Sequence, residues 1–513
     1  MNDNMNDNMN NVFYRPKWTC GRYNSTKHVA IMFNTLTDGE YFFKNESADV
    51  IGLVLAAGRN GQVSVQRISE ILNISPESIE PFFNSLLEIG LLSDTYPTEE
   101  KIEEYRTYCN SLPNVTSFSG KEAEQYFPSC GVVNTLEIAY SDAVDDCTYI
   151  TSVGFELTYR CSENCLHCYN IGATRNDAEK SGRGNFNEMS LNDYKRIIDE
   201  MCDAGLVSAL ITGGDPFAHK DVWKVLEYLY KKDIAVIIQT NGQQLVNQVD
   251  RLANLYPRLV KLSVYAADPV AHDSITRKKG SWQTTVDVIS ALREKGISVE
   301  ISCVLMRPGL KSYIDLKSLS ESLSCRVFFD LNVTDSIEND RCATHHLRLT
   351  PEELEIVMLD PDVDNIKGPF HNLVPCKGLR CKAGNGSFCV MPDGKLIPCE
   401  AMHMVLGDLK TQSLQTILKN NPLLNRLLNA DESEYVECGT HDYCKCCVIC
   451  HGLSYNKTGN PFNPNENNCY MAKCKYDLIR KLKQGIDVLN GGTIKDCICK
   501  LPDYHFIRMH REY

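Results

Sequence analysis

The sequence Glu156-Leu-Thr-Tyr-Arg-Cys-Ser-Glu-Asn-Cys-Leu-His-Cys-Tyr169 places three cysteines on one short segment, directly after an apolar, strand-like run at 150–157. Iron–sulfur clusters are built on cysteine thiolates, so Cys161, Cys165 and Cys168 are predicted to bind three irons of a [4Fe–4S] cluster. The fourth iron would then be free to bind a small cofactor. A zinc site is the alternative; zinc needs a fourth ligand in a tetrahedral set, and His167 is adjacent.

The cysteine motif resembles that of the radical S-adenosylmethionine (SAM) enzymes, and later segments extend the resemblance. They are, in chain order, Thr212-Gly-Gly-Asp-Pro216, Gln239-Thr-Asn-Gly242, Leu262-Ser-Val-Tyr265 and the run 275–282. The resemblance implies that Gly213, Gly214 and Asp215 receive the methionine amino group, with glycine allowing close approach to the ligand. Asp215 stands where the family has Glu, which keeps the charge but shortens its reach. Ser263 is expected at the ribose and Arg277 at the SAM carboxylate; Tyr169 and Asn241 complete the expected cofactor site.

Strand and helix patterns alternate through this part of the chain. Ser190 and Asp193 have the spacing of a helix N-terminal cap, and the apolar residues that follow recur at helical spacing. Further apolar, strand-like runs lie at 206–211, 234–238, 260–264, 299–305 and 327–331. Repeated strand–helix units favour an α/β fold with a parallel sheet covered by helices. The resemblance implies a partial (β/α)6 barrel, with its ligand groups at the C-terminal ends of the strands.

Composition limits the classes of function. The 513 residues suggest about three domains. The net charge of −13 disfavours nucleic acid and anionic membranes as partners. We expect no membrane span, because no apolar run reaches roughly 18 residues, and no signal peptide. The 24 cysteines then favour metal binding over disulfides, which points to a reducing cytoplasm.

Thirteen of the cysteines lie after residue 375, where a second motif begins. The run 390–399 predicts a β-hairpin with Pro-Asp-Gly as its turn. The spacing Cys381-x12-Gly394-x4-Cys399 resembles the opening of a SPASM domain, which carries auxiliary iron–sulfur clusters in peptide-modifying radical SAM enzymes. Gly407-Asp-Leu409 continues that pattern.

The later cysteines depart from the SPASM pattern of four cysteines spaced two, five and three apart. Cys444-x5-Cys450 fits the middle pair, but His441 and either Leu453 or Ser454 stand where the outer cysteines are expected. One hypothesis is that Cys376, Cys381 and Cys399 hold a first auxiliary cluster with an open iron. The others are that Cys446 or Cys447 completes it, or that the thiols bind zinc. The candidate auxiliary ligands are Cys376, Cys381, Cys399, Cys438, Cys444, Cys447, Cys450 and Cys469.

Residues 25–95 follow a different pattern. Strand-like runs at 28–34 and 40–44 precede helical runs at 47–58, 63–72 and 75–90. Pro76 suits a first helical turn, whereas Pro81 is expected to strain or kink the helix. The pattern resembles a small winged helix, and in particular the PqqD-like domain, in which a leader peptide adds as a strand to a sheet edge. Residues 1–95 hold 7 Lys/Arg and 11 Asp/Glu, which disfavours DNA binding; a purely structural cap remains an alternative.

We therefore expect the following order along the chain: a disordered tail at 1–24, a PqqD-like peptide-recognition domain at 25–95, a linker at 96–149, a radical SAM barrel at 150–345, a SPASM-like domain at 346–485 and a C-terminal tail at 486–513. Together the resemblances imply an oxidoreductase that matures a ribosomally made precursor peptide, with electrons from a flavodoxin- or ferredoxin-type donor. Cleavage of SAM would give a 5′-deoxyadenosyl radical that takes hydrogen from a substrate carbon.

Several reactions fit this class of enzyme. An open auxiliary iron favours thioether crosslinks from a cysteine sulfur to an unactivated carbon. Peptide epimerisation, carbon–carbon crosslinking and sulfatase-maturase-type chemistry are the alternatives within the class. A non-catalytic iron–sulfur sensor with a winged helix is the alternative from another class. The sequence identifies no general acid or base.

Overall fold

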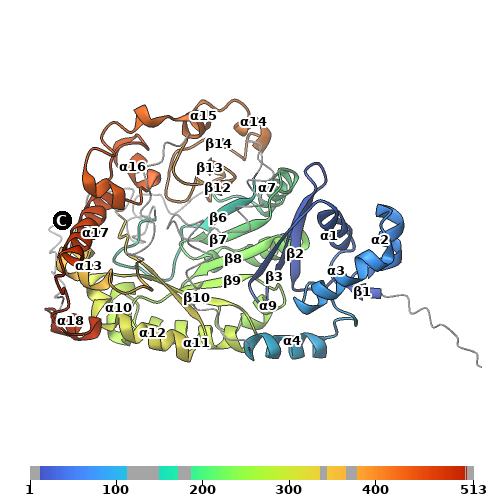
Figure 1. Ribbon diagram of the computed structural model, residues 1–513, viewed down its shortest axis with the longest axis horizontal. Helices are drawn as coiled ribbons and strands as arrows, with labels where there is room; N and C mark the ends of the chain where they lie inside the picture. Colours follow the sequence, from blue (N-terminus) through green and yellow to red (C-terminus); the bar gives the residue numbers. More distant parts are fainter. Residues whose placement is uncertain are drawn as a thin grey trace, which may run out of the picture.

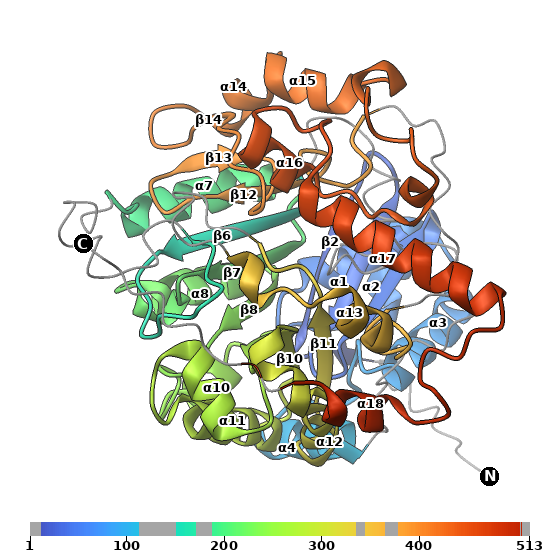
Figure 2. The same cartoon turned by 90° about the vertical axis from the view of Figure 1, so that its left-hand side faces the viewer.

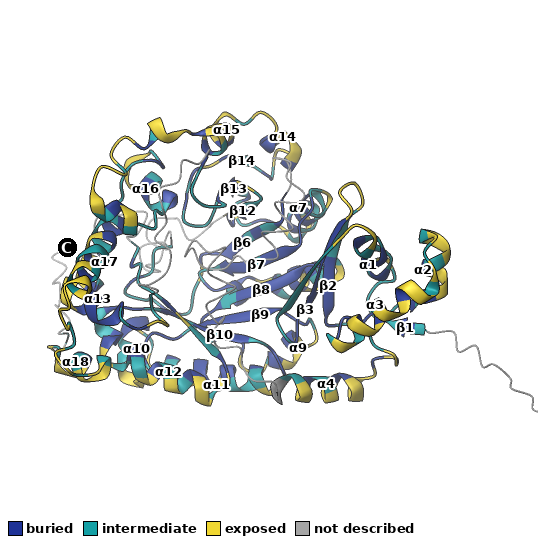
Figure 3. Cartoon of the chain, in the orientation of Figure 1, coloured by how far each residue is buried: buried dark blue, intermediate teal, exposed yellow. Residues whose placement is uncertain are grey.

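The computed structural model describes residues 12–111, 150–170, 187–334, 344–364, 378–502 and residue 504. A nine-stranded sheet forms its centre, and a separate three-stranded sheet belongs to the N-terminal part (Figure 1). Figure 3 shows the strands of both sheets largely buried, while exposed residues gather on the outward faces of helices. Among the described helices, none combines the length and the apolar character that crossing a bilayer requires.

Six parallel strands make up most of the central sheet. They are β6 (Ser152–Thr158), β7 (Ser208–Gly213), β8 (Ala235–Thr240), β9 (Leu259–Ser263), β10 (Val299–Val304) and β11 (Arg326–Asp330). Neighbours in space are neighbours in sequence, from β6 to β11. The predicted α/β fold with a parallel radical SAM-type sheet is therefore confirmed.

Helices between the strands cover the outer face of the sheet. They are α7 (Leu191–Asp203), α8 (Val222–Lys231), α9 (Val249–Ala253), α10 (Pro269–Thr276), α11 (Ser281–Glu294) and α12 (Tyr313–Ser322). Helix α7 begins as its sequence predicts, because Ser190 and Asp193 form a reciprocal capping box. Its apolar residues Tyr194, Ile197 and Met201 are buried in the main core with those of the strands.

The C-terminal cysteine-rich part continues the same sheet. Strand β12 (Ser387–Val390) pairs parallel to β6, which the sequence did not indicate. The predicted hairpin is confirmed, since β12 pairs antiparallel to β13 (Lys395–Ile397), which pairs in turn with β14 (Gly407–Asp408). Extending the barrel sheet in this way places Cys399, two residues after β13, beside the barrel.

Six further helices belong to the C-terminal part of the chain. They are α13 (Pro351–Val357), α14 (Leu414–Leu418), α15 (Pro422–Asn429), α16 (His451–Thr458), α17 (Glu466–Lys483) and α18 (Ile494–Lys500). Figure 2 shows α13 and α17 in front of the sheet. Residues 486–513 were expected to be a tail; instead α18 is an ordered helix in this segment, because Ile498 is buried in the main core.

The N-terminal module is a small α/β unit. Its sheet has the order β2 (Thr19–Asn24), β3 (Val29–Asn34), β4 (Gly39–Lys44), and β1 (Val12–Tyr14) pairs separately with β5 (Gln62–Ser64). Its helices are α1 (Glu46–Ala56), α2 (Val65–Leu72) and α3 (Pro76–Glu88), and α3 runs continuously through Pro81. The expected tail at 1–24 is too long, because β1 and β2 lie within it and Phe13 and Cys20 are buried.

This module packs on the N-terminal ends of the barrel strands. Ile31 and Phe33 of β3 share a buried cluster with Val207 and Ala235, at the start of β7 and β8. Arg258, just before β9, forms ion pairs of 2.8 Å with Asp38 and 2.5 Å with Glu40, at 2 % side-chain exposure for the arginine. In Figure 1 the module lies at one end of the barrel and α17 at the other.

The expected linker at 96–149 begins with a helix. Helix α4 (Glu99–Ser111) lies against the barrel, where Arg106 Nη2 donates to the carbonyl of Ala253 at 3.3 Å. The rest of this linker, with Cys130 and Cys147, lies outside the described residues.

Candidate functional site

A cavity of about 180 Å³ opens at the C-terminal ends of the parallel strands. The three thiols of Cys161, Cys165 and Cys168 line it. So do residues from the ends of five strands, among them Thr212, Thr240, Ser263, Ser302 and Asp330. The structure therefore brings together the segments that the sequence motifs predicted to meet, which are far apart in the chain.

Hydrogen bonds to two neighbours fix the cysteine loop. The backbone N–H groups of Asn164 and Leu166 donate to the carbonyls of Thr276 and Ile275, at the end of α10. On the other side, the Asn241 amide donates to Cys161 Sγ at 3.3 Å. The loop is thus held between the turns that follow β8 and β9.

The three thiols fit an iron–sulfur cluster better than a single metal ion. Burial raises the pKa of Cys165 well above its usual value, and the charges of Glu163, Cys168 and Cys161 raise it further. Thiolates gathered in this way need bound cations to be stable. Among the described residues, no group of His, Cys, Asp or Glu is arranged to chelate one metal ion. A cubane cluster, whose ligand sulfurs lie farther apart, suits these three thiols, whereas the zinc alternative is not supported.

The Gly-Gly-Asp turn has a packing role that differs from the one expected. Gly213 has φ +129°, and a Cβ on it would lie 2.3 Å from the carbonyl oxygen of Thr158. Gly214 N–H donates to that same oxygen at 2.7 Å. Glycine is required here because the backbone after β6 passes close by, so approach to a ligand is not what demands it.

Both carboxylate oxygens of Asp215 accept hydrogen bonds from neighbouring turns of the fold. One carboxylate oxygen accepts from Thr240 Oγ1 at 2.8 Å and from the N–H of Asn241 at 3.1 Å; the other accepts from the N–H of Phe217 at 2.9 Å. The side chain is fully buried, burial raises its pKa, and it does not line the cavity. The expected contact between Asp215 and the methionine amino group is not supported by this position.

Of the other residues expected to bind the cofactor, some line the cavity and one does not. Tyr169, Asn241 and Ser263 line the cavity as predicted. Arg277 does not: it is exposed at the C-terminus of α10, with φ 55°. Arg277 at the SAM carboxylate therefore stays a prediction that this position does not support.

Two residues for which the sequence predicted no role contribute polar groups to the cavity. Glu163 lies between the first two cysteines and is 7 % exposed. Asp330, at the end of β11, accepts hydrogen bonds from the backbone and side-chain amides of Asn332. Nothing in their sequence context marks Asp330, whereas Glu163 stood inside the quoted motif.

A buried acidic group lies behind the cavity. Tyr159 Oη donates to Glu156 Oε2 at 2.7 Å, and burial raises the pKa of Glu156 to about 7. The carboxylate of Glu400, directly after Cys399, lies nearby, and desolvation raises its pKa as well. Tyr169 is close enough to both for their charges to raise its own pKa. This acidic group connects the barrel thiols to the cysteine-rich domain.

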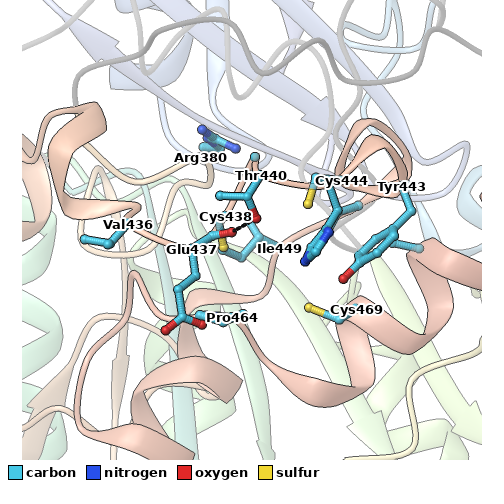
Figure 4. A pocket seen from close by; sticks show the side chains of 14 residues that line it. Arg380, Val436, Glu437, Cys438, Thr440, Tyr443, Cys444, Ile449, Pro464 and Cys469 are labelled. Atoms are coloured by element: carbon cyan, nitrogen blue, oxygen red, sulfur yellow. Dashed lines mark hydrogen bonds between the residues drawn. The ribbon is translucent and has the colours of Figure 1, made fainter.

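A second thiol-lined cavity, of about 310 Å³, lies in the cysteine-rich domain. Cys438, Cys444, Cys447 and Cys469 all line it. Figure 4 shows the sulfur atoms of Cys438, Cys444 and Cys469 directed toward a common space, with Arg380 above them. Burial raises the pKa of Cys438 to about 11 and that of Cys447 to about 12, the neighbouring thiols raise both further, and the guanidinium of Arg380 offsets a small part of the rise. Four thiols around one cavity fit a second iron–sulfur cluster.

A third group of thiols belongs to the lining of neither cavity. Cys399 is partly buried; burial raises its pKa well above its usual value, and the charges of Cys381 and Cys450 raise it further. Cys450 is also close to Asp330 at the mouth of the barrel. The sequence paired Cys450 with Cys444, but the structure separates them, since Cys450 does not line the second cavity. Cys376 lies outside the described residues.

Cys446 belongs to neither group. Its charged neighbours are Lys475, Asp364, Lys483 and Lys445, and it does not line the second cavity. Cys447 lines the second cavity instead of joining Cys399. Neither cysteine is therefore placed to complete the first auxiliary group, and Cys450 takes that position.

Comparison with known protein families agrees with this arrangement. Residues 155–315 match the radical SAM superfamily model, and residues 381–450 match the SPASM model, described as an iron–sulfur cluster-binding domain. These ranges contain the barrel thiols and most of the auxiliary thiols. The domains identify the cofactors as [4Fe–4S] clusters and SAM.

Individual relatives are distant. The chain is 26 % identical over 319 residues to the antilisterial bacteriocin subtilosin biosynthesis protein AlbA of Bacillus subtilis, covering 59 % of this chain and 68 % of that protein. It is 23 % identical over 340 residues to the AdoMet-dependent heme synthase of Methanosarcina barkeri, covering 60 % and 93 %. The crystal structure of Streptococcus suis SuiB bound to precursor peptide SuiA has a similar fold, with a TM-score of 0.52, 15 % identity, and coverage of 89 % and 99 %. This chain thus contains a radical SAM domain followed by a SPASM iron–sulfur domain, and its sequence is similar to a bacteriocin biosynthesis protein and to AdoMet-dependent heme synthases.

Proposed function

We propose that this protein matures a ribosomally made precursor peptide by forming thioether crosslinks between cysteine sulfur and an unactivated carbon. The observation that carries the proposal is the presence of three separate thiol groups: the one that lines the barrel cavity, Cys399 with Cys381 and Cys450, and the one that lines the second cavity. Two thiol groups beyond the barrel suit chemistry that removes electrons from a substrate held at the barrel mouth.

The protein's own part in this chemistry is to bind and orient. When bound, a reduced cluster and SAM supply a radical that takes one hydrogen atom from a substrate carbon. The cysteine-rich domain would then accept the electron that remains on the substrate. Forming a carbon–sulfur bond releases one hydrogen atom from carbon, one proton from the thiol and one electron, and an auxiliary cluster on Cys381, Cys399 and Cys450 accepts that electron. Epimerisation involves no net oxidation of the peptide, so it does not need an auxiliary cluster as electron acceptor.

The hypothesis of an open auxiliary iron loses its support. It depended on a missing fourth cysteine, yet Cys450 lies beside Cys399. With Cys381 they give three thiols, and the predicted ligand Cys376, which lies outside the described residues, would be the fourth. The proposal of thioether formation therefore depends on electron acceptance, and carbon–carbon crosslinking, which also releases an electron, is the second candidate.

We infer that the N-terminal module binds the leader of the precursor. Its sheet has β2 and β4 as edges, and β4 is partly exposed along its length. A peptide added to β4 would gain main-chain hydrogen bonds. The module lies at the N-terminal ends of the strands and the cavity at their C-terminal ends. A strand of six residues spans about 20 Å, so leader and modified residues must be separated by at least roughly six extended residues.

The deciding experiment is co-expression with a candidate precursor, followed by mass spectrometry. We expect a loss of two hydrogens per crosslink, with one cysteine per link resistant to alkylation. The same mass loss with every cysteine still alkylatable would mean carbon–carbon linkage. An unchanged mass with D-residues would mean epimerisation. SAM cleavage with turnover of a porphyrin precursor and none of peptide would reject the maturase proposal.

An external electron donor and a cytoplasmic location belong to the same proposal. We infer that a flavodoxin or ferredoxin reduces the clusters, as the resemblance to radical SAM enzymes implies. Reduction by an added flavodoxin, followed by SAM cleavage, tests this part. The alternative of sulfatase-maturase-type chemistry gives no role to the N-terminal module, whose strand β3 packs against the barrel. We therefore favour a precursor peptide as the substrate.

A further inference from the structure

Arg380 brings a positive charge to the second thiol-lined cavity. Its side chain is part of the cavity lining, and Figure 4 shows it above the sulfur atoms of Cys438, Cys444 and Cys469. Nε is buried without a hydrogen-bond partner, and no carboxylate in the described part of the chain forms an ion pair with the guanidinium. Buried donors normally have acceptors, so this one fits a cavity that receives an anionic group.

The position of Arg380 is fixed at both ends of the residue. Its backbone N–H donates to His451 Nε2 at 3.1 Å. Its guanidinium lies over the ring of Tyr435, 4.4 Å from the ring centre, which is the geometry of a cation–π contact. Tyr435 is itself packed edge-on against Phe462, with ring centres 5.2 Å apart. The charge is therefore held in place without a carboxylate to neutralise it.

A fixed cation beside a cluster favours the reduced form of that cluster. Reduction adds one negative charge, and the net charge near a cluster and the hydrogen bonds to its sulfurs set its reduction potential. An arginine side chain stays charged in proteins, so it stabilises the added electron at every relevant pH. Glu437 is the one carboxylate among the described residues that line the cavity; it is exposed, where water and salt screen its charge.

We propose that Arg380 raises the reduction potential of the cluster held in the second cavity, so that this cluster can retain an electron taken from the substrate. The inference rests on the electron-accepting role proposed above for the cysteine-rich domain. Arg380 is a positioning residue in this scheme: it acts through its charge on the cluster and is assigned no contact with the peptide.

The test is an anaerobic redox titration of the full chain with all its clusters, followed by electron paramagnetic resonance, without SAM or peptide. The signal of the second cavity is the one that is lost when Cys438, Cys444 and Cys447 are changed to Ala. For R380Q we expect its ratio of reduced to oxidised cluster at a given potential to fall by about tenfold, which lowers the midpoint potential by about 59 mV. R380K retains the charge and should keep this ratio within about threefold of the wild type. The barrel signal should not shift in either variant.

Arg426→Gln is the matched control. Its guanidinium lies 5.4 Å from the ring centre of Phe462, in the same group of aromatic side chains, but it pairs with Glu434 at 2.9 Å and does not line the cavity. The potential of the second cluster should be unchanged in this variant. An equal fall in Arg426→Gln and R380Q would overturn the assignment to Arg380.

A wild-type potential in R380Q with full iron content would also overturn the proposal. If R380Q failed to assemble this cluster, R380K would decide: assembly at the wild-type potential supports the role of the charge, whereas failure of both variants to assemble it, or a lowered potential in R380K, rejects that role. Absence of the second-cavity signal from the wild type would reject the cluster itself. Failure to modify a peptide, with these potentials as expected, would count against the proposed function alone.

Discussion

The carboxylate of Asp215 accepts a hydrogen bond from the backbone N–H of Asn241 at 3.1 Å, which ties the turn after β7 to the turn after β8. Asn241 in turn donates from its side chain to Cys161 Sγ. One buried acid therefore connects two strand ends to the first cluster thiol, and the alignment of the site depends on it.

Replacing Asp215 by Ala should destabilise the barrel. The change leaves three buried donors without an acceptor, at roughly 1–3 kcal/mol each, so we expect the free energy of unfolding of the cluster-free protein to fall by at least about 3 kcal/mol. Thermal unfolding followed by circular dichroism measures it. Asp193→Ala, which removes an exposed helix cap, should cost only about 1 kcal/mol. Equal effects of the two changes would show that Asp215 is not the stronger structural group.

Arg258 should be needed to hold the N-terminal module on the barrel. Arg258→Ala leaves Glu40 and Asp38 without this cation in a largely buried interface, and breaking such pairs costs about 3–5 kcal/mol. We expect faster proteolysis between the module and the barrel. Arg251→Ala removes an ion pair with Glu227 in which both side chains are 49 % exposed; it should change stability by less than about 1 kcal/mol.

The auxiliary thiols should behave as two independent sets. Changing Cys438, Cys444 and Cys447 together to Ala should remove about four irons per chain and leave the barrel cluster intact. Changing Cys399 and Cys450 should remove a different set, with a distinct electron paramagnetic resonance signal. Cys446→Ala is the control and should retain all iron. Loss of the same signal in both variants would show that the thiols form one site.

Acid should destabilise the cluster-free protein through its buried histidines. Burial lowers the pKa of His167, His272 and His451 to about 4. Above pH 6.5 these rings are neutral in both states. Below it the unfolded chain binds protons that the folded chain cannot, so stability falls as pH drops from 6.5 toward 4, by about 1.4 kcal/mol per histidine and pH unit.

His272→Gln is the matched variant for this pH effect. In the wild type the backbone N–H of Tyr265 donates to His272 Nδ1 at 3.2 Å. A glutamine side chain retains an oxygen that can accept this hydrogen bond. The slope of melting temperature against pH between 6.5 and 5 should become shallower. An unchanged slope would mean that His272 does not contribute to acid sensitivity.

The sequence predicted the barrel well because each of its signals is local. Apolar runs marked all six parallel strands, and the Ser190–Asp193 spacing marked the start of α7. The hairpin before Cys399 was also predictable, since its turn needs Pro-Asp-Gly and Gly394 has φ +90°.

Features that depend on long-range packing were not predictable. Pairing of β12 with β6 joins residues far apart in the chain, and no local pattern encodes it. Asp215 was expected in the cavity because its turn matches a motif, yet its shorter side chain bonds to the β8 turn. Cys450 follows Cys444 in sequence but lies with Cys399 in space. Glu163 stood between two ligands and drew no separate prediction.

The most direct test of the central claim is formation of 5′-deoxyadenosine by the reduced protein with SAM, for the wild type and for the variant with Cys161, Cys165 and Cys168 all changed to Ala. The account predicts that the wild type forms it, and that the variant loses one [4Fe–4S] cluster and all SAM cleavage, while iron on the auxiliary thiols remains. Formation of 5′-deoxyadenosine by the triple variant at the wild-type rate would contradict the assignment of this cavity as the radical SAM site.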